Sequence, residues 1–280
     1  MEAALFLDGR GMTALPESLR GAAELRHLDV RGNRLASLPA WLAELPALES
    51  LSIGENPLRG IPPEVTALTG LRHLYAHELE LESVPEATGL RTLDLGHNRL
   101  STLPPSAARL TALETLYLAD NRLATLPEAV RGMRALRYLG ATDNGLTKLP
   151  PWIGELGRLV ELRLYRNTLT ALPHAIGRLR ALRELHLHDN RIAALPATVG
   201  ELVDLRQLDL RNNALSAVPA ELGRLARLRV LDLRGNRLDA LPDALGDLPA
   251  LEKLDLRWNR FADLPAACAP LRARGCVVLA

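Results

Sequence analysis

A glutamate and two histidines alternate along one short stretch of the sequence, at Glu184, His186 and His188. In an extended strand, side chains at alternate positions point to the same side, so these three groups would share one face. Imidazole nitrogens and carboxylate oxygens ligate zinc. The spacing therefore indicates a candidate metal or small-ligand site around His186 and His188. Because the spacing fixes no further ligand, two surface histidines on a recognition strip are the plainer interpretation.

Tyrosine and arginine side chains occupy comparable positions in neighbouring stretches of alternating apolar and polar residues. Tyr and Arg are enriched at interface hot spots, because they bury a large area with little loss of rotamer entropy. Tyrosine also favours exposed strand positions for structural reasons alone. We interpret the group as the contact surface for another protein or peptide; it consists of Tyr75, His77, Tyr117, Tyr138, Arg163, Tyr165, His186 and His188.

Other classes of function have little support in the sequence. No nucleophile elbow, phosphate-binding loop, dinucleotide fingerprint or HExxH motif occurs, so we expect neither an enzyme nor a cofactor. The 34 basic and 33 acidic residues leave a formal charge of +1. Such a chain has no net field to attract nucleic acid or an anionic membrane. The prediction is a non-catalytic protein with a protein partner, no nucleic acid and no membrane.

These residues recur because the chain is built from a 23-residue repeat with the pattern LxxLxLxxNxLxxLPxxLxxLxx. The stretches LRHLDVRGNRLASLP, LETLYLADNRLATLP and LRVLDLRGNRLDALP show it clearly. Such a period predicts a solenoid. We predict a single repeat domain over residues 1–280, with a half unit from Arg274 after twelve units that begin at residues 2, 25, 48, 71, 90, 113, 136, 159, 182, 205, 228 and 251.

Each part of the unit predicts a local structure. Apolar residues at the fourth and sixth positions with polar neighbours indicate a short strand, and one strand per unit gives a parallel sheet. The ninth-position asparagine, found in ten units, can donate to and accept from turn backbone groups. The proline at the fifteenth position suits the first turn of a short helical or 3-10 return. Wider returns outside narrow strands predict a curved α/β solenoid, with the sheet concave and the turns convex.

The pattern resembles the leucine-rich repeat proteins, and specifically the 23-residue class with the LP signature. That class includes intracellular Ras-group-like signalling scaffolds and bacterial effectors. The resemblance covers nearly the whole chain and implies a solenoid that binds other proteins. Arg10 and Leu79 depart from the pattern because they stand where asparagine is expected. Cysteine-rich flanks, which are typical of extracellular members, are also missing.

Composition and termini suggest where the protein works. The first residues, MEAALFLDGRGM, lack a basic segment followed by an apolar run, and no apolar stretch is long enough to span a bilayer. Rich use of Ala, Arg, Gly and Pro points to a GC-rich, bacterial genome. We therefore predict a cytoplasmic protein, with delivery to a host cell as an alternative. Cys268 lies at an apolar repeat position, which predicts a reduced, buried thiol rather than a disulfide.

The last full units carry a different set of charges on the same face. They read LDLRNN, LDLRGN and LDLRWN, which stacks Asp209, Asp232 and Asp255 beside a parallel row of arginines. Such a face would neutralise itself and serve as scaffold. Trp258, at an exposed rim position, favours the alternative that this face recognises a charged partner.

One unit breaks the period, in the stretch LYAHELELESVPEATGL. Four residues are missing between Pro85 and Leu90. We expect the sheet to continue through the unit, and the alternation in HELELE predicts extended chain with Leu79 and Leu81 inward. We also expect the turn groups beside Leu79 to find new partners. The break is predicted to be a joint at the edge of the binding surface, with neutral decay as the alternative.

Overall fold

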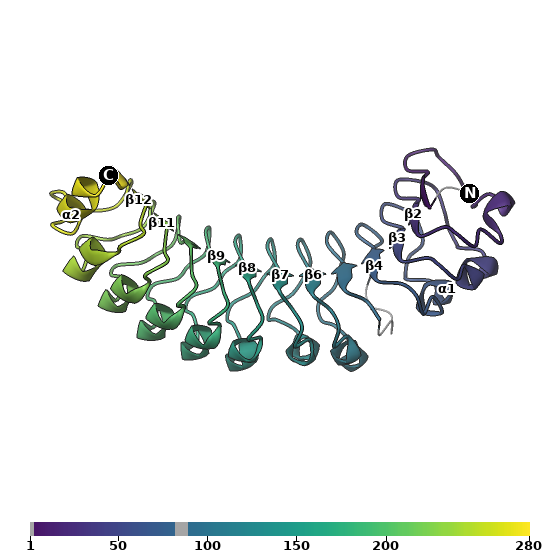
Figure 1. Cartoon of the computed structure of the whole chain (residues 1–280), viewed down its shortest axis with the longest axis horizontal. Helices are drawn as coiled ribbons and strands as arrows, with labels where there is room; N and C mark the ends of the chain where they lie inside the picture. Colours follow the sequence, from purple (N-terminus) through teal and green to yellow (C-terminus); the bar gives the residue numbers. More distant parts are fainter. Residues whose placement is uncertain (1–2, 82–88) are drawn as a thin grey trace. The chain divides into compact units, whose positions relative to one another are not determined.

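The computed structural model describes residues 3–81 and 89–280. The backbone divides into two compact units, which are described separately. Unit 1 comprises residues 1–123 and 127–136, and unit 2 comprises residues 124–126 and 137–280. In each unit, strands line one side and short helical segments line the other (Figure 1). The predicted parallel sheet with helical or 3-10 returns is therefore confirmed within each unit.

The strands of unit 1 pair in parallel in the order of the sequence. Each strand begins at the third position of its repeat, and its middle residue is an inward apolar side chain. The strands are β1 (Ala4–Phe6), β2 (His27–Asp29), β3 (Ser50–Ser52), β4 (His73–Tyr75), β5 (Thr92–Asp94) and β6 (Thr115–Tyr117).

The strands of unit 2 follow the same rule, also parallel and in sequence order. They are β7 (Tyr138–Gly140), β8 (Glu161–Arg163), β9 (Glu184–His186), β10 (Gln207–Asp209), β11 (Val230–Asp232), β12 (Lys253–Asp255) and β13 (Val277–Leu279). Val277 pairs with Lys253, so the half unit at the end is aligned one residue later than a start at Arg274 predicts.

The return segments are short, and most are 3-10 helices that follow the repeat proline. None of the helices in the part of the chain that is described is long and apolar enough to cross a membrane. Neighbouring returns approach so closely that a Cβ at Gly223 would lie 2.5 Å from the carbonyl oxygen of Ala244. The returns are η1 (Glu17–Leu19), η2 (Ala40–Glu44), α1 (Pro63–Thr66), η3 (Pro105–Arg109) and η4 (Glu128–Gly132) in unit 1, and η5 (Pro151–Glu155), η6 (His174–Arg178), η7 (Ala197–Glu201), η8 (Ala220–Arg224), η9 (Asp243–Asp247) and α2 (Cys268–Ala273) in unit 2.

Leucines fill the core between the strands and the returns, and the repeat asparagines hold the turns. Asn236 is typical: its Nδ2 donates to the carbonyl oxygens of Leu210 and Leu233, and its Oδ1 accepts from the backbone N–H of Leu215. It therefore holds the turn of its own coil, as predicted, and joins it to the coil before it, where the sequence suggests the coil after it. The thiols of Cys268 and Cys276 are buried and unbridged, which confirms the prediction for Cys268.

The eighth residue of every full unit adopts a left-handed backbone conformation, with φ between 50° and 66°. These residues precede the asparagine position and turn the chain out of the strand. Glycine and short polar side chains tolerate this region best. The residues are Gly9, Gly32, Glu55, Glu78, His97, Asp120, Asp143, Arg166, Asp189, Asn212, Gly235 and Trp258.

The two units without the asparagine have a second left-handed residue two positions later, Gly11 at φ 68° and Glu80 at φ 56°. Extended chain through HELELE is therefore wrong: the segment is a double turn. Leu79 and Leu81 are nonetheless buried, and Glu78 and Glu80 are exposed. Since a left-handed residue reverses the chain locally, alternation in sequence here produces the predicted burial without a strand.

The sheet continues through the unit that breaks the period, because β4 pairs with both β3 and β5. The backbone N–H groups of Leu79 and Leu81 both donate to the Oδ1 of Asn98, at 3.0 Å each. The turn therefore finds its partner in the next repeat, as expected. The shortened return between Pro85 and Leu90 falls mostly in residues 82–88, which lie outside the described residues.

Candidate functional site on the strand face

In unit 2, Tyr138 and Arg163 lie side by side on the strand face. Arg163 Cζ stands 5.6 Å from the centroid of the Tyr138 ring, within the range of a cation–π contact. The Arg163 Nε also donates to the Oε1 of Glu161, two residues earlier in β8. Burial lowers the pKa of Arg163, but the hydrogen bond to Glu161 and the attraction of Tyr138, Glu161 and Tyr165 together outweigh it, and the pKa rises. The pair is a planar, charged and pre-ordered contact group.

Tyr165 and His188 form a second pair, one repeat apart. Their rings are stacked, with centroids 4.3 Å apart and an interplanar angle of 8°. His188 is only 8% exposed, so most of its ring is covered by its neighbours, and its place among the partner-binding residues stays a prediction. Its Nδ1 lies 2.8 Å from Asp189, and its role is to support the Tyr165 ring. Burial raises the pKa of Asp189, but hydrogen bonds from Asn212 and His188 outweigh it and lower the pKa.

His186 belongs to a different group from His188. Its Nε2 lies 3.1 Å from Glu184, and one ligand atom each of Glu161, Glu184 and His186 lies within 4.8 Å of the others. One imidazole and two carboxylates are an acceptable donor set for zinc with an open fourth position. Arg163 already forms an ion pair with Glu161, and this pair would have to break before Glu161 could bind a metal. The candidate ligand set therefore changes from two histidines to two glutamates and one histidine.

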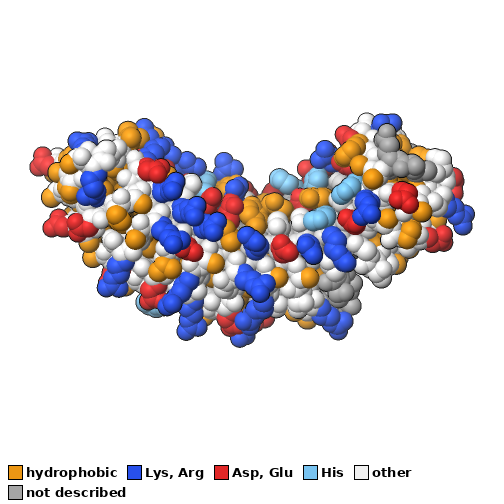
Figure 2. All heavy atoms as spheres, in the orientation of Figure 1, with side chains coloured by type: hydrophobic (Ala, Val, Ile, Leu, Met, Phe, Trp, Pro, Cys, Tyr) orange, Lys and Arg blue, Asp and Glu red, His pale blue; other side chains and the backbone are white. Residues whose placement is uncertain are grey.

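In unit 1, the predicted residues lie on β4, its following turn and β6. Tyr75 is separated from Tyr117 by Asp94, which pairs with both in the strand register. The His77 ring follows Tyr75 and lies over Gly54, where an added Cβ would stand 2.7 Å from His77 Cε1. Histidine side chains gather over the strands of this unit in Figure 2. Tyr75 and His77 thus join one surface, and Tyr117 lies two strands away.

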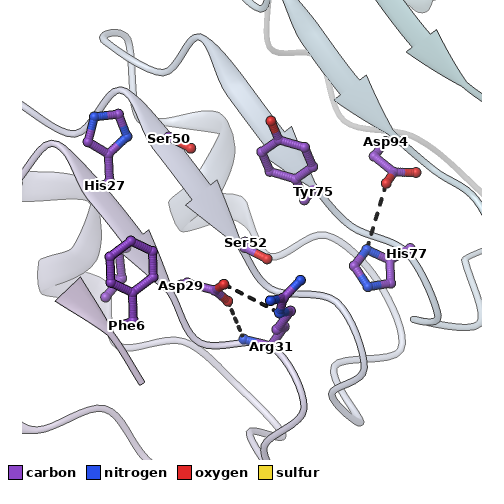
Figure 3. Close-up of a pocket in the computed structure, with 10 residues that line it drawn as sticks. Phe6, His27, Asp29, Arg31, Ser50, Ser52, Tyr75, His77 and Asp94 are labelled. Carbon is purple, nitrogen blue, oxygen red and sulfur yellow. Dashed lines mark hydrogen bonds and ion pairs between the residues drawn. The ribbon is translucent and has the colours of Figure 1, made fainter. Parts of the chain in front are cut away.

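A trough lies beside Tyr75 and His77, with a volume of about 320 Å³. Leu28 is among the residues that line it. Ser50 and Ser52 lie between Tyr75 on one side and Phe6 and His27 on the other (Figure 3). Sequence reasoning missed the trough. The signal was present, since Ser50, Ser52 and Gly54 are small residues at the three positions where the neighbouring strands present large ones.

The Asp and Arg rows of unit 2 pair with each other, as the scaffold interpretation predicts. Arg257 Nη2 lies 2.7 Å from Asp255, and Arg234 Nη2 lies 2.9 Å from Asp232. Asp255 is fully buried under these contacts. Trp258 is 72% exposed, with Arg257 Cζ 5.5 Å from its ring centroid. The face is therefore neutralised internally, with one exposed indole at its rim.

Sequence models of the leucine-rich repeat match most of the chain. The one described as "Leucine-rich repeat region" matches residues 130–233, and two described as "Leucine rich repeat" match residues 88–146 and residues 24–45 and 227–248. The chain belongs to the leucine-rich repeat family. No sequence among curated proteins matches it significantly.

Solved structures of leucine-rich repeat proteins share the fold. A leucine-rich repeat protein of Leptospira interrogans is 29% identical, with a TM-score of 0.64 over 96% of this chain and 81% of that chain. The ectodomain of a plant membrane receptor kinase from Arabidopsis thaliana, in complex with Casparian strip integrity factor 2, is 28% identical, with a TM-score of 0.75 over 95% of this chain and 36% of that chain. The chain spans about a third of that ectodomain. An internalin of Listeria monocytogenes, 22% identical with a TM-score of 0.72, covers 99% of this chain and 86% of its own and shows the fold alone.

Proposed function

We propose that this leucine-rich repeat protein is a non-catalytic binding module that holds another protein or peptide against its strand face. One observation carries the proposal: aromatic and guanidinium groups on that face are held in place before any partner arrives. Arg163 is fixed over Tyr138 by Glu161, and His188 supports the Tyr165 ring. A pre-ordered contact surface loses little entropy on binding.

The family and its structural relatives support the same function. The Arabidopsis ectodomain is a leucine-rich repeat structure in complex with a named factor, and this chain is 28% identical to it. Fold likeness does not specify a partner. The proposed contact residues of this chain come from its own strand face: Tyr138, Arg163, Tyr165 and His186, supported by His188, in unit 2, and Tyr75, His77 and Tyr117 in unit 1. We further propose a cytoplasmic location, with delivery to a host cell as the alternative.

The test replaces three tyrosines and measures which proteins of the lysate the variant still captures. A Tyr117→Ala, Tyr138→Ala and Tyr165→Ala variant serves as bait in native lysate beside the wild type, and Glu201→Ala in η7 serves as the matched control. Circular dichroism first establishes that all three proteins are folded. Proteins that bind wild type and control, but are lost with the triple variant, support the proposal. Equal retention by the folded triple variant contradicts it.

Metal binding is the second candidate, because ligand atoms of Glu161, Glu184 and His186 converge within 4.8 Å. Three protein ligands leave a zinc ion one open coordination position. Calorimetric titration with zinc separates the two candidates. Binding heat with a dissociation constant in the micromolar range, lost in His186→Ala and kept in His188→Ala, would establish a site on these three residues. No heat with the wild type would eliminate it.

A further inference from the structure

The trough in unit 1 exists because one strand carries no large side chain on its outer face. At the positions where β2 and its turn present His27, Asp29 and Arg31, β3 and its turn present two serines and a glycine. The backbone continues in register beneath the gap. The gap in the large outward side chains is therefore one strand wide, while the residues that line the trough extend from Phe6 on β1 to Asp94 on β5. Its volume of about 320 Å³ is at the lower end of the range for ligand pockets. That size suits a single side chain.

Flat rings stand on both sides of the trough. Phe6 is 62% exposed, and its ring lies on the same side as His27, facing Tyr75 across the two serines in Figure 3. Exposed rings at the sides of a gap each offer a π-surface to a planar or cationic group that enters it. An arginine side chain has an apolar stem and a planar, charged end, and so matches walls of this kind.

The charges around the trough favour a cation. Asp29 is neutralised by Arg31, whose Nε lies 3.4 Å away and whose backbone N–H also donates to the carboxylate. At the other end, Asp94 Oδ2 lies 3.8 Å from His77 Nδ1, which is too long for a hydrogen bond, and this buried nitrogen has no hydrogen-bond partner among the described residues. The other ring nitrogen of His77 lies 3.3 Å from Glu55.

His73, on β4, does not supply a positive charge that would balance Asp94. Burial lowers the pKa of His73, and repulsion from His27 lowers it further, which disfavours the charged form of this ring. Two carboxylates, Asp94 and Glu55, flank His77, and the only arginine that lines the trough among residues 3–81 and 89–280 is the one that already pairs with Asp29. The far end of the trough is an anionic end wall for whatever enters.

We infer that this trough binds an arginine side chain of the partner, with the guanidinium stacked on the Tyr75 ring and pointing to Asp94. The inference rests on the proposed function, because it supplies one anchor of the same partner. Arginine fits better than lysine, since a guanidinium both stacks on rings and donates two parallel hydrogen bonds to a carboxylate. A carboxylate ligand would meet Asp94, and a purely aliphatic one would leave the serine hydroxyls without partners.

The test uses a defined probe and an uncharged twin of it. N-acetyl-arginine methylamide is titrated into the isotope-labelled full chain, and NMR follows the signals of Ser50, Ser52 and Tyr75. The citrulline derivative has the same length and planarity without the charge and serves as the control probe. We expect shifts at these residues with arginine, and binding weaker by roughly tenfold or more with citrulline, because a charge-assisted hydrogen bond is lost.

Two variants identify the site. Asp94→Asn keeps the oxygen that accepts from the Gly96 backbone N–H and removes the charge, so arginine binding should fall by about tenfold. Ser52→Leu fills the floor and should abolish binding of the probe. Asp232→Asn, on β11 in unit 2, is the matched control for loss of a carboxylate and should bind as the wild type does.

Several outcomes would overturn the inference. They are an absence of shifts at the trough with the arginine probe, equal binding of arginine and citrulline, and unchanged binding in both Asp94→Asn and Ser52→Leu. These results are independent of the capture experiment on the tyrosines. If captured proteins depend on the tyrosines and the probe does not bind, only the trough assignment fails. If the probe binds and no protein depends on the strand face, the proposed function fails and the trough remains as a cation site.

Discussion

The strand faces around β3 and around β10 to β12 use the same backbone for opposite purposes. At β3 the outward side chains are so small that the face is hollow, and the carboxylate at its end is only weakly paired. At β10 to β12 each strand adds an aspartate and each turn an arginine, and these side chains cover one another until Asp255 is fully buried. The third, fifth and seventh residues of each repeat, whose side chains face outward, therefore decide whether the strand face is open to a ligand.

The two regions also differ in how charge is balanced. Arg234 lies between two aspartates, with its guanidinium nitrogens 2.9 Å from Asp232 and 3.8 Å from Asp255. In the trough, Arg31 forms an ion pair with Asp29, and Asp94 faces His77 instead of an arginine. A face that has satisfied its own charges gains little from a charged partner, because the partner must displace existing ion pairs. This contrast favours unit 1 over the last strands as the place where a cationic group binds.

The largest expected effect concerns the leucine core, which lies beneath both regions. Leu51 beneath the trough and Leu231 beneath the ion pairs are both fully buried. Leu51→Ala and Leu231→Ala should each lower the free energy of unfolding by about 2–5 kcal/mol, since each leaves a cavity in a packed core. Urea denaturation followed by circular dichroism measures this. A loss below about 1 kcal/mol for only one of them would show that the two cores are not equivalent.

The next largest effect compares a regular turn with the turn that lacks its asparagine. Asn98 accepts hydrogen bonds from both Leu79 and Leu81, whereas Asn236 accepts one from Leu215. Each buried group left unpaired costs about 1–3 kcal/mol. Asn98→Ala should therefore destabilise the protein more than Asn236→Ala. Denaturation midpoints test the order, and equal midpoints would mean that water replaces the additional bond.

Acid–base behaviour within unit 2 provides a third test. Burial raises the pKa of Asp232, and repulsion from Asp209 and Asp255 adds to the rise. Its ionisation therefore opposes folding, and this contribution reduces stability as pH rises above the ordinary aspartate value. Burial would also raise the pKa of Asp255, but the hydrogen bonds from Arg257 outweigh it and lower the pKa. The charged form of Asp255 therefore favours folding, and this contribution is lost as pH falls through the lowered pKa.

Single amide substitutions should separate these opposite signs. At pH 7, Asp255→Asn should lower the melting temperature by a few degrees, and Asp232→Asn should leave it unchanged or raise it slightly. Differential scanning calorimetry at pH 7 and at pH 3 measures both, and the difference between the variants should shrink at the lower pH. If both variants lose the same stability at pH 7, the three aspartates do not repel one another as their stacking implies.

The smallest effect on stability should come from filling the hollow. Ser52→Leu adds side-chain volume above the sheet without entering the core, so the free energy of unfolding should change by less than about 0.5 kcal/mol. Thermal melting tests this beside the probe titration. Stability lost on the scale of a core substitution would mean that Ser52 is structurally required, and the loss of binding in that variant would then need a milder one, Ser52→Thr, to interpret it.

Much of this structure follows from the sequence, because the repeat tests every inference many times. The alternation around each fourth position predicted the strands, the asparagine predicted the bonded turn, and the proline predicted the short return. Leu79 and Leu81 were correctly placed inside, although by alternation in a segment that is not extended. The positions that face outward on each strand could also be read directly, including the small residues at Ser50, Ser52 and Gly54 that make the trough.

The sequence could not decide which of several adjacent side chains each polar or aromatic group would contact. His186 and His188 look equivalent as letters, yet one ring lies beside Glu184 and the other is buried against Tyr165. Arg163 could pair with several acids, and it selects Glu161 on its own strand. The second left-handed residue at Glu80 is set by the two amides that converge on Asn98. Repeat spacing determines which side chains are adjacent, whereas their rotamers and hydrogen bonds are settled by competition among all adjacent groups at once, and that competition exists only after the coils are stacked.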